Sequence, residues 1–412
     1  MRVLLSTFGS RGDVQPLLAL AVALRARGAD ARVSAPADQE FVELFTAAGV
    51  PLLPAFTTVR DWVKEMLPKR ETMSLPKIAA QVIAAQYEAI SAGADAFGAN
   101  GPDVMVVNGV FSSVVAAQSV AEKRGMRYVL AAYCPFFLPS PHSRPFLFPG
   151  HPFPPGVTDN QALWDHNAQV MNELFGEALN KLRTSIGLST LDNVRDHAFT
   201  DRPLLAADAV LAPWPGSPRM EVVQTGAWIL PDERPLSAEL QAFLDAGSPP
   251  VYVGFGSLPA PKDFARTAIE VVRAKGRRIL LSRGWAELAL ADDRDDCFII
   301  DEVNQQALFP RVATVIHHGG AGTTTAAARA GSPQLIVPQI ADQPYWAGRV
   351  QDLGIGAAHD GPTPTAESLA AALEHTLNPA TRARARAVAG TIRSDGATCA
   401  ANLLLEEGPS SH

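Results

Sequence analysis

A glycine-rich turn near residue 320 constrains the fold of this chain more than any other feature. Residues 313–316 form an apolar run that predicts a β-strand, residues 317–322 read HHGGAG, and residues 323–330 have the Ala- and Thr-rich composition of a helix. Another apolar run at 335–337 predicts the next strand. A strand, a tight turn and a helix N-terminus together direct free backbone N–H groups and the helix dipole at one point. The sequence therefore predicts α/β architecture with an anion site at this turn, where glycine lets a diphosphate approach the backbone.

Predicted strands and helices alternate along the rest of the chain in two successive series. The first series has strands at 3–8, 31–35, 104–107 and 128–132, with helices at 16–27, 41–48 and 112–124. The second has strands at 251–255, 278–282, 298–300, 313–316 and 335–337, with a helix at 264–275. Such alternation is typical of parallel sheets covered by helices. We therefore predict an α/β protein with two Rossmann-like, doubly wound domains, and a binding site in the cleft where the two sheets face each other.

The length of the chain agrees with two domains. Its 412 residues are too many for one hydrophobic core and suit two domains of about 200 residues each. We place these domains at 1–212 and 237–394, joined by a proline-rich linker at 213–236. Residues 395–412 would form a C-terminal helix and tail.

Composition excludes several classes of function. A net charge of −7 gives no electrostatic reason to expect nucleic-acid binding. The apolar runs are too short to span a membrane, and the N-terminus enters a strand without a signal-peptide pattern. Cys134, Cys297 and Cys399 are isolated and the histidines are scattered, which argues against a disulfide scaffold or a metal site. We therefore expect a cytoplasmic protein without a metal centre or an integral membrane span.

The segment from His318 to Gln343 resembles a known donor-binding signature. It is similar to that of the nucleotide-sugar-dependent glycosyltransferases of the two-Rossmann (GT-B) type, above all the branch that modifies glycopeptide (vancomycin-group) aglycones. In that family the His of the turn binds the donor phosphate, and an acidic residue followed by Gln, 24 residues later, holds the sugar hydroxyls. Here His318 is followed at the same spacing by Asp342 and Gln343. Asp342 has an alternative role as the N-cap of a helix at 345–353.

The resemblance implies further donor-binding residues in the second domain. The backbone at Gly320, Gly322 and Thr323 would hold the diphosphate, together with Ser257 in the first turn of this domain. Trp285, Val303 and Gln306 stand where the family holds the nucleobase, although Trp285 is equally explained as core packing. In the family the last helix crosses back to the N-terminal domain, and residues 397–405 are its counterpart here. The resemblance also implies that no cofactor is bound permanently and that the nucleotide sugar is a cosubstrate.

The first turn of the chain is the predicted catalytic site. Residues 12–16 read Gly-Asp-Val-Gln-Pro, where many relatives have Gly-His-Val-x-Pro and use that His as the general base. Asp13 replaces the His here, as in the glycopeptide and sterol glycosyltransferases that the chain resembles. A carboxylate at the carboxyl edge of the sheet can accept the proton of an acceptor hydroxyl, while the alternative role for Asp13 is a helix N-cap. Ser10 is a candidate hydrogen-bonding partner of either substrate, and Arg11 a phosphate contact or a solvated charge.

Two stretches, 57–86 and 134–164, break the alternation and are predicted to be irregular insertions. The second is rich in aromatic residues and proline. It would pack on its own side chains, or form the wall of an acceptor pocket for a flat, largely apolar molecule, or contact a membrane surface. For the acceptor wall we select Phe136, Phe137 and His142.

These observations predict an inverting glycosyltransferase that moves a sugar from a dTDP- or UDP-sugar to a hydroxyl of a natural-product aglycone. Base and leaving group on opposite sides of the sugar imply a single displacement. A sterol or other lipid-like acceptor is the alternative within this class. A nucleotide-sugar epimerase shares the two-domain plan but has no need of a large apolar acceptor wall. A catalytically silent nucleotide-sugar-binding protein would have lost Asp13.

Overall fold

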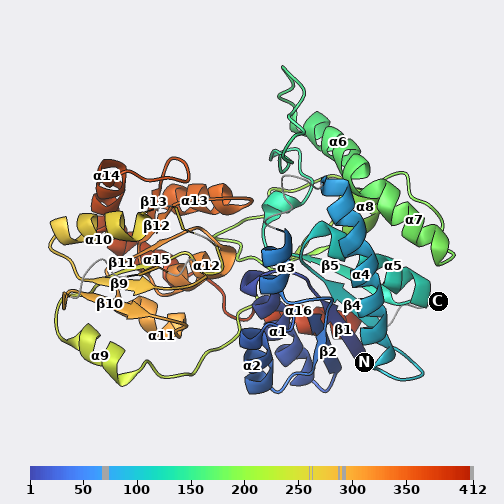
Figure 1. The fold of residues 1–412 in the computed structure, drawn as a ribbon, viewed down its shortest axis with the longest axis horizontal. Helices are drawn as coiled ribbons and strands as arrows, with labels where there is room; N and C mark the ends of the chain where they lie inside the picture. The colour runs from blue at the N-terminus through green and yellow to red at the C-terminus, as the bar shows by residue number, and fades with distance from the viewer. Residues whose placement is uncertain (67–73, 259, 262, 286–287, 290–293, 409–412) are drawn as a thin grey trace. The chain divides into compact units, whose positions relative to one another are not determined.

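The chain folds into two compact units, each built on its own parallel sheet (Figure 1). The structure is a computed structural model and describes residues 1–412 except 67–73, 259, 262, 286–287, 290–293 and 409–412. The first unit comprises Met1–Ala207, Pro213–Leu230 and Ser394–His412, and the second comprises Asp208–Ala212 and Pro231–Arg393. The predicted fold class, α/β with two doubly wound sheets, is confirmed.

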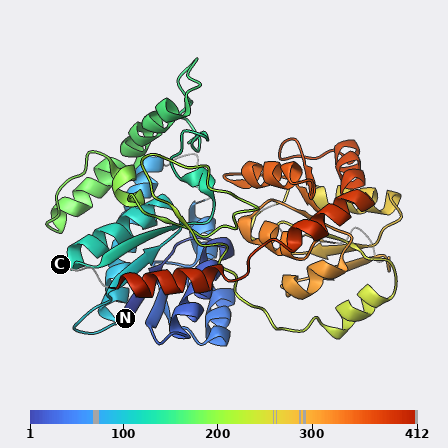
Figure 2. The same cartoon turned by 180° about the vertical axis from the view of Figure 1, so that it is seen from behind.

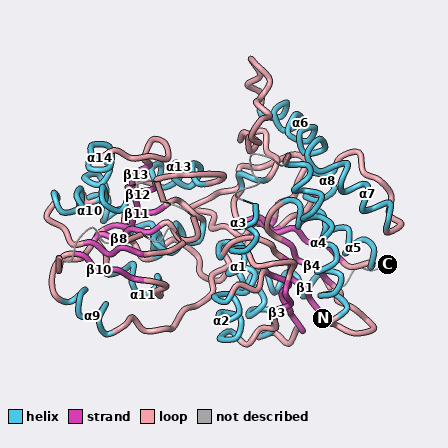
Figure 3. Tube along the Cα trace, viewed as in Figure 1, coloured by secondary structure: helices cyan, strands magenta, loops and turns pink. Residues whose placement is uncertain are grey.

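The first unit contains a seven-stranded sheet in the order β3-β2-β1-β4-β5-β6-β7, and every pair of neighbours is parallel. Figure 3 shows strands of this sheet in magenta among helices in cyan. Its central strands are almost continuously apolar because helices cover both faces of a parallel sheet. The strands are β1 (Arg2–Ser6), β2 (Asp30–Ala35), β3 (Leu52–Pro54), β4 (Val104–Val107), β5 (Arg127–Ala132), β6 (Leu204–Leu205) and β7 (Val223–Gln224).

The helices of the first unit include two in a stretch that the sequence predicted to be irregular. They are α1 (Arg11–Arg25), α2 (Gln39–Ala48), α3 (Val59–Met66), α4 (Leu75–Asp95), α5 (Phe111–Arg124), α6 (Asn160–Met171), α7 (Glu177–Ser185), α8 (Val194–Phe199) and α16 (Gly396–Glu407), with short η1 (Pro135–Phe137) and η2 (Asn172–Gly176). Within 57–86, α3 and the first half of α4 correct the prediction. Pro76 occupies the first turn of α4, where proline is favourable because the missing N–H would have no partner within the helix.

Two late segments of the chain complete the first unit. Part of the predicted linker at 213–236 is strand β7, the last strand of this sheet, because a two-residue strand leaves no periodic signal in a proline-rich segment. Helix α16 packs against α1, and Figure 2 shows it as the red helix beside the blue N-terminal elements. A Cβ on Gly396 would lie 2.4 Å from the carbonyl oxygen of Ala227, so only glycine permits this approach of the two segments.

The second unit repeats the plan with six parallel strands in the order β10-β9-β8-β11-β12-β13. These are β8 (Val251–Gly254), β9 (Ile279–Ser282), β10 (Cys297–Ile300), β11 (Thr314–His317), β12 (Gln334–Ile336) and β13 (Gly356–Ala358). The helices are α9 (Ala238–Asp245), α10 (Phe264–Ala274), α11 (Gln305–Leu308), α12 (Ala321–Arg329), α13 (Gln343–Asp352), α14 (Ala366–Thr376) and α15 (Pro379–Ala389), with a short η3 (Phe309–Arg311).

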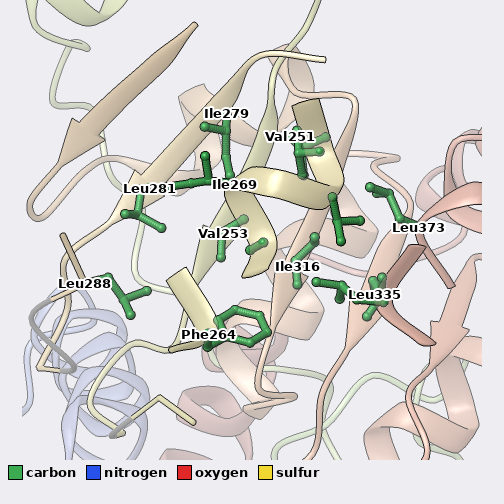
Figure 4. Close-up of a cluster of buried hydrophobic side chains, with 14 of the residues drawn as sticks. Val251, Val253, Phe264, Ile269, Ile279, Leu281, Leu288, Ile316, Leu335 and Leu373 are labelled. Carbon is green, nitrogen blue, oxygen red and sulfur yellow. The ribbon is translucent and has the colours of Figure 1, made fainter. Parts of the chain in front are cut away.

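A hydrophobic core holds the helices of the second unit on its sheet. Figure 4 shows Val251 and Val253 of β8, Leu281 of β9 and Ile316 of β11 directed toward Phe264 and its neighbours from α10. Fully burying a large apolar side chain contributes about 1.5–3 kcal/mol. This core therefore fixes the ends of β8 and β11, from which the loops of the candidate donor site start.

The described residues form neither a membrane-spanning helix nor a cluster of metal-binding side chains. No helix among them is long and apolar enough to cross a membrane. Nor do three or more His, Cys, Asp or Glu side chains gather in that part of the chain as they would to hold a metal ion.

Candidate functional site

The turn after β1 holds the Asp13 carboxylate in a defined position. Ser10 is the N-cap residue of α1 and Asp13 is the third residue of the helix, where its Oδ2 accepts a hydrogen bond from the Ser10 backbone N–H at 2.9 Å. Asp13 is therefore not the N-cap residue, although its side chain helps to cap the N-terminus of the helix. A Cβ on Gly9 would lie 2.1 Å from Asp13 Oδ2. Only glycine at position 9 leaves room for the carboxylate in this position.

Two neighbours help to define the surroundings of Asp13. Tyr133, just after β5, donates a hydrogen bond from its hydroxyl to the backbone oxygen of Asp13 at 3.2 Å. Burial raises the pKa of Tyr133 well above its usual range, and the charge on Asp13 raises it further, so the hydroxyl stays protonated and can donate. Arg11 Nε donates to Gln15 Oε1 on the next turn of α1 at 3.1 Å.

The aromatic segment after Tyr133 divides into two groups. The rings of Phe146 and Phe148 meet edge to face with centroids 5.0 Å apart, and Phe148 also contacts the ring of Phe175. This part of the segment therefore packs against other side chains of the first unit. Phe136 and Phe137 lie on η1 with ring centroids 5.4 Å apart, and Phe137 is 38% exposed.

His142 follows this second group. Its side chain is exposed, and its backbone N–H donates to Ser140 Oγ at 3.2 Å. Of the aromatic segment, Phe137 and His142 are therefore the two predicted acceptor residues that face solvent, while Phe136 is half-buried.

In the second unit, the glycine-rich turn joins β11 to α12. The helix begins at Ala321, two residues before the predicted start, because Gly320 takes the N-cap position and Gly322 is tolerated in the first turn. Gly320, Gly322 and Thr323 therefore lie at the helix N-terminus. The backbone N–H groups of the first turn there have no acceptor within the helix. The positive end of the helix dipole adds to this, so the turn has the physical properties of an anion site.

The two adjacent histidines of the turn have different environments. His317 is completely buried, its Nε2 lies 2.9 Å from Gln334 Oε1, and its Nδ1 accepts the N–H of Gly319 at 3.1 Å. Since Nδ1 accepts, the proton of the neutral ring is on Nε2, and burial lowers the His317 pKa to about 3. His317 therefore joins β11 to β12, as expected for a structural residue.

His318 lies in a slot made by two glycines. A Cβ on Gly320 would lie 2.6 Å from His318 Nε2, and one on Gly256 would lie 3.3 Å from its Cε1. Burial lowers the pKa of His318 to about 4, so the ring is neutral near pH 7. Its Nδ1 is buried and has no hydrogen-bond partner in the described part of the chain. Buried polar atoms in proteins usually have a hydrogen-bond partner, so this Nδ1 is a candidate contact for a ligand.

The other donor residues predicted in this unit lie in the segments that follow neighbouring strands of its sheet. Ser257 follows Gly256 in the turn after β8, and the Trp285 N–H, after β9, donates to the Gly256 oxygen at 2.8 Å. Val303 lies after β10, and Gln306 lies on α11. Asn304 between them is the N-cap of α11. The turns after β8, β9 and β11 thus meet at Gly256.

The Asp342–Gln343 pair begins α13, and its two side chains are used differently. Asp342 occupies the N-cap position without a side-chain capping bond, and its Oδ2 instead accepts the Trp346 Nε1–H at 2.8 Å. Burial raises the pKa of Asp342, and the Trp346 hydrogen bond opposes that rise. Gln343 Oε1 accepts the backbone N–H groups of Gln339 and Ile340 at 2.7 and 3.1 Å. The capping alternative for the Asp342 side chain is therefore not observed.

The glycine-rich turn also contacts this pair. Gly319 has a φ of +95°, and a Cβ there would lie 3.2 Å from the Gln343 backbone oxygen. The second unit thus brings together the turn after β8, His318, the start of α12 and the start of α13. Sequence reasoning missed Gly9 and Trp346, which position Asp13 and Asp342. The signal for Trp346 was its place four residues after Asp342 on a helix, where side chains meet.

Known proteins resemble this chain along nearly its whole length. Residues 289–400 match the family model described as "Erythromycin biosynthesis protein CIII-like, C-terminal domain". The chain is 54% identical to glycosyltransferase GtfE of Amycolatopsis orientalis over 404 residues, 98% of this chain and 97% of that protein. It is 52% identical to the vancomycin aglycone glucosyltransferase of the same organism over 406 residues, with the same coverage of both chains.

A solved structure shares the fold. The glycosyltransferase VinC in complex with dTDP superposes with a TM-score of 0.66 at 20% identity, over 98% of this chain and 99% of that one. The fold and the end-to-end identity lead to one conclusion: this chain is a glycosyltransferase and belongs to the two-Rossmann (GT-B) family that includes the glycopeptide-antibiotic enzymes of Amycolatopsis orientalis.

Proposed function

We propose that this glycosyltransferase transfers a sugar from a dTDP- or UDP-sugar to a hydroxyl of a glycopeptide-type aglycone in the cytoplasm, with inversion at the anomeric carbon. The observation that carries the proposal is the environment of His318. Its buried Nδ1, which has no partner among the described residues, lies beside a helix N-terminus and a slot of two glycines. A nucleoside diphosphate supplies the hydrogen-bonding partner and the negative charge that this arrangement lacks.

The second unit would hold the donor. The diphosphate would lie at the start of α12, where His318, as a neutral ring, and the backbone N–H groups of Gly322 and Thr323 receive the charge that develops on the leaving group. Ser257 would contact the same diphosphate, while Trp285 and the 303–306 segment would hold the base. The sugar would be bound by Asp342 and by the Gln343 amide nitrogen, since Gln343 Oε1 already accepts two backbone N–H groups.

Asp13 would be the general base. As the acceptor oxygen forms its bond to the anomeric carbon, its proton passes to the Asp13 carboxylate. The bond from the anomeric carbon to the phosphate oxygen breaks, and its electron pair leaves with the nucleoside diphosphate. This single displacement inverts the configuration of the anomeric carbon. Ser10 would hydrogen-bond a substrate beside the base, and Arg11 would offer positive charge to the phosphate.

The acceptor proposal rests on the relatives that match the chain from end to end. One of them is named a vancomycin aglycone glucosyltransferase and is 52% identical to this chain. Phe136, Phe137 and His142 would contribute to the acceptor site. We do not favour a sterol acceptor or an epimerase, because no described contact requires either.

Two assays in sequence test the proposed function. Thermal unfolding is first measured with a panel of dTDP- and UDP-sugars, where a true donor at about 100 times its Kd should add about 2.7 kcal/mol of stability. The stabilising donors are then incubated with glycopeptide aglycones, and mass spectrometry should show the addition of one sugar. The anomeric configuration of the product, read by NMR, should be opposite to that of the donor. Transfer to sterols but to no glycopeptide aglycone would contradict the acceptor assignment.

A further inference from the structure

Three arginine residues gather at the amino-terminal edge of the sheet in the second unit. Arg277 stands just before β9, and Arg382 and Arg386 lie on α15. The strands of this sheet are parallel, so their amino-terminal ends lie at the edge opposite the turns after β8, β9 and β11. The mechanism above uses those turns and leaves the arginine edge without a role.

Arg382 attaches α15 to this edge. Its guanidinium donates to the backbone oxygen of Val312 at 2.8 Å and to that of Ala313, immediately before β11. Strands β9 and β11 are both direct neighbours of β8 in the sheet. The start of β9, which Arg277 precedes, is therefore separated from the start of β11 by one strand only.

Arg386 lies one helical turn after Arg382, so both side chains are on the same face of α15. A Cβ on Gly331 would lie 3.2 Å from Arg386 Cγ, so the stem of this side chain packs on the turn before β12. Arg386 is nevertheless exposed, while Arg277 and Arg382 are half-buried. The three guanidinium groups thus lie around the starts of β9, β11 and β12, within reach of solvent.

These positive charges act on each other, and no acidic side chain balances them. Burial lowers the pKa of Arg382, and the charges of Arg386 and Arg277 lower it further. Within the described ranges of the chain, Arg277 and Arg386 form no ion pair. The chain as a whole has a net charge of −7, so its composition gives no reason for arginines to gather without acidic partners. Like charges held together repel, and a bound anion removes that cost.

We propose that Arg277, Arg382 and Arg386 form a second anion site, which binds a phosphate group at the edge of the sheet opposite the donor turns. A phosphate dianion carries two charges and several acceptor oxygens, so it can accept hydrogen bonds from more than one guanidinium. A single carboxylate offers one charge and two oxygens and balances the three arginines less well. The site lies outside the sugar-transfer reaction and goes beyond the proposed function.

Titration calorimetry with inorganic phosphate, at an ionic strength held constant with NaCl, tests this site. Arg386→Gln keeps the Cβ and Cγ that pack near Gly331 and removes the charge. Arg277→Gln removes a charge from a different segment of the chain. Each change should weaken phosphate binding roughly tenfold, because each removes a charge-assisted hydrogen bond.

Arg384→Gln is the matched control on the same helix. Arg384 Nε donates to the Leu353 oxygen at 2.9 Å, and the residue lies about half a turn from both Arg382 and Arg386. This variant should bind phosphate like the wild type. Phosphate bound at the donor turn would contribute equally in all four proteins, so the differences between them report the arginine site alone.

Thermal unfolding at low salt separates anion binding from a structural role. If Arg386 only supports the fold, Arg386→Gln should have a lower Tm than the wild type with or without phosphate. The anion site predicts the reverse without phosphate, because the change relieves repulsion and the Tm stays equal or rises. Added phosphate should then raise the Tm of the wild type and of Arg384→Gln more than that of Arg386→Gln.

Vesicles identify the source of the phosphate group. Wild-type protein that sediments with phosphatidic acid vesicles but not with phosphatidylcholine vesicles, and loses this binding in Arg386→Gln, would assign the site to a lipid headgroup. The tenfold loss in calorimetry without vesicle binding would assign it to a free phosphate compound. Equal phosphate affinity of the wild type, Arg277→Gln and Arg386→Gln, with no vesicle binding, would overturn the proposal. These assays need neither sugar donor nor acceptor, so their outcome is independent of the proposed function.

Discussion

The contact between Gly9 and Asp13 can be tested by a double-mutant cycle. In Gly9→Ala the new Cβ would lie 2.1 Å from Asp13 Oδ2 and 2.5 Å from its Cγ, distances that no real structure tolerates. The carboxylate must rotate and lose its 2.9 Å hydrogen bond from the Ser10 N–H. A hydrogen bond to a charged group contributes about 1.5–3 kcal/mol. Gly9→Ala should therefore lower the free energy of unfolding by about 2 kcal/mol.

The partner variant removes the cause of the clash. In an Asp13→Ala background no carboxylate remains and only the Cβ of residue 13, at 3.0 Å, stays close, so the same Gly9→Ala change should cost much less stability. Urea unfolding of the wild type, both single variants and the double variant then yields the coupling energy between the two positions, which we expect to be about 2 kcal/mol. Turnover of Gly9→Ala should also fall, by about 10²-fold or more, because the displaced base is out of place. Additivity of the two changes within about 0.5 kcal/mol would refute the geometry.

Three further predictions concern the second unit. Burial lowers the His317 pKa from 6.5 to about 3, so the unfolded chain takes up a proton at a higher pH than the folded one. The free energy of unfolding should therefore be highest above pH 6.5 and should fall between pH 6.5 and 3, by up to ~1.4 kcal/mol per pH unit. His317→Asn should flatten the pH dependence of the free energy of unfolding between pH 6.5 and 4, and parallel curves would contradict this. His318→Ala should weaken dTDP binding, measured by calorimetry, by about 1.5–3 kcal/mol, whereas the affinity of the wild type for dTDP should vary little from pH 6 to 8. Equal dTDP affinity of the two proteins would show that His318 does not bind the diphosphate. Asp342→Ala should leave dTDP affinity unchanged but lower the rate with the whole sugar donor. The rate with a donor that lacks the contacted hydroxyl should change little. An equal loss of rate for every donor, with a matching loss of Tm, would show that Asp342 has only a structural role.

The parts of this fold that local sequence encodes were predictable. The apolar runs of β8 and β11 indicated the parallel sheet of the second unit, because burial on two faces restricts residue type, and the glycines between β11 and α12 indicated the tight turn that joins them. Helix α3 was missed because it has only eight residues, half of them charged, and the strand β3 before it has only three residues.

Other features depend on contacts that no local pattern contains. The role of Gly9 depends on the direction of a side chain four residues later, and Asp342 turns to Trp346 rather than to its own helix cap. The left-handed conformation of Phe56 contradicts the preference of its residue type, so only the surrounding structure reveals it. These are the positions where tertiary packing overrides local propensity.

Asp13→Asn tests the central claim most directly. The amide oxygen of asparagine can still accept the Ser10 N–H, so the fold and the Tm should be retained while the basicity is lost. We predict that kcat for sugar transfer falls by roughly 10²–10⁴, with dTDP affinity unchanged. A folded Asp13→Asn enzyme that transfers sugar at the wild-type rate would show that Asp13 is not the general base.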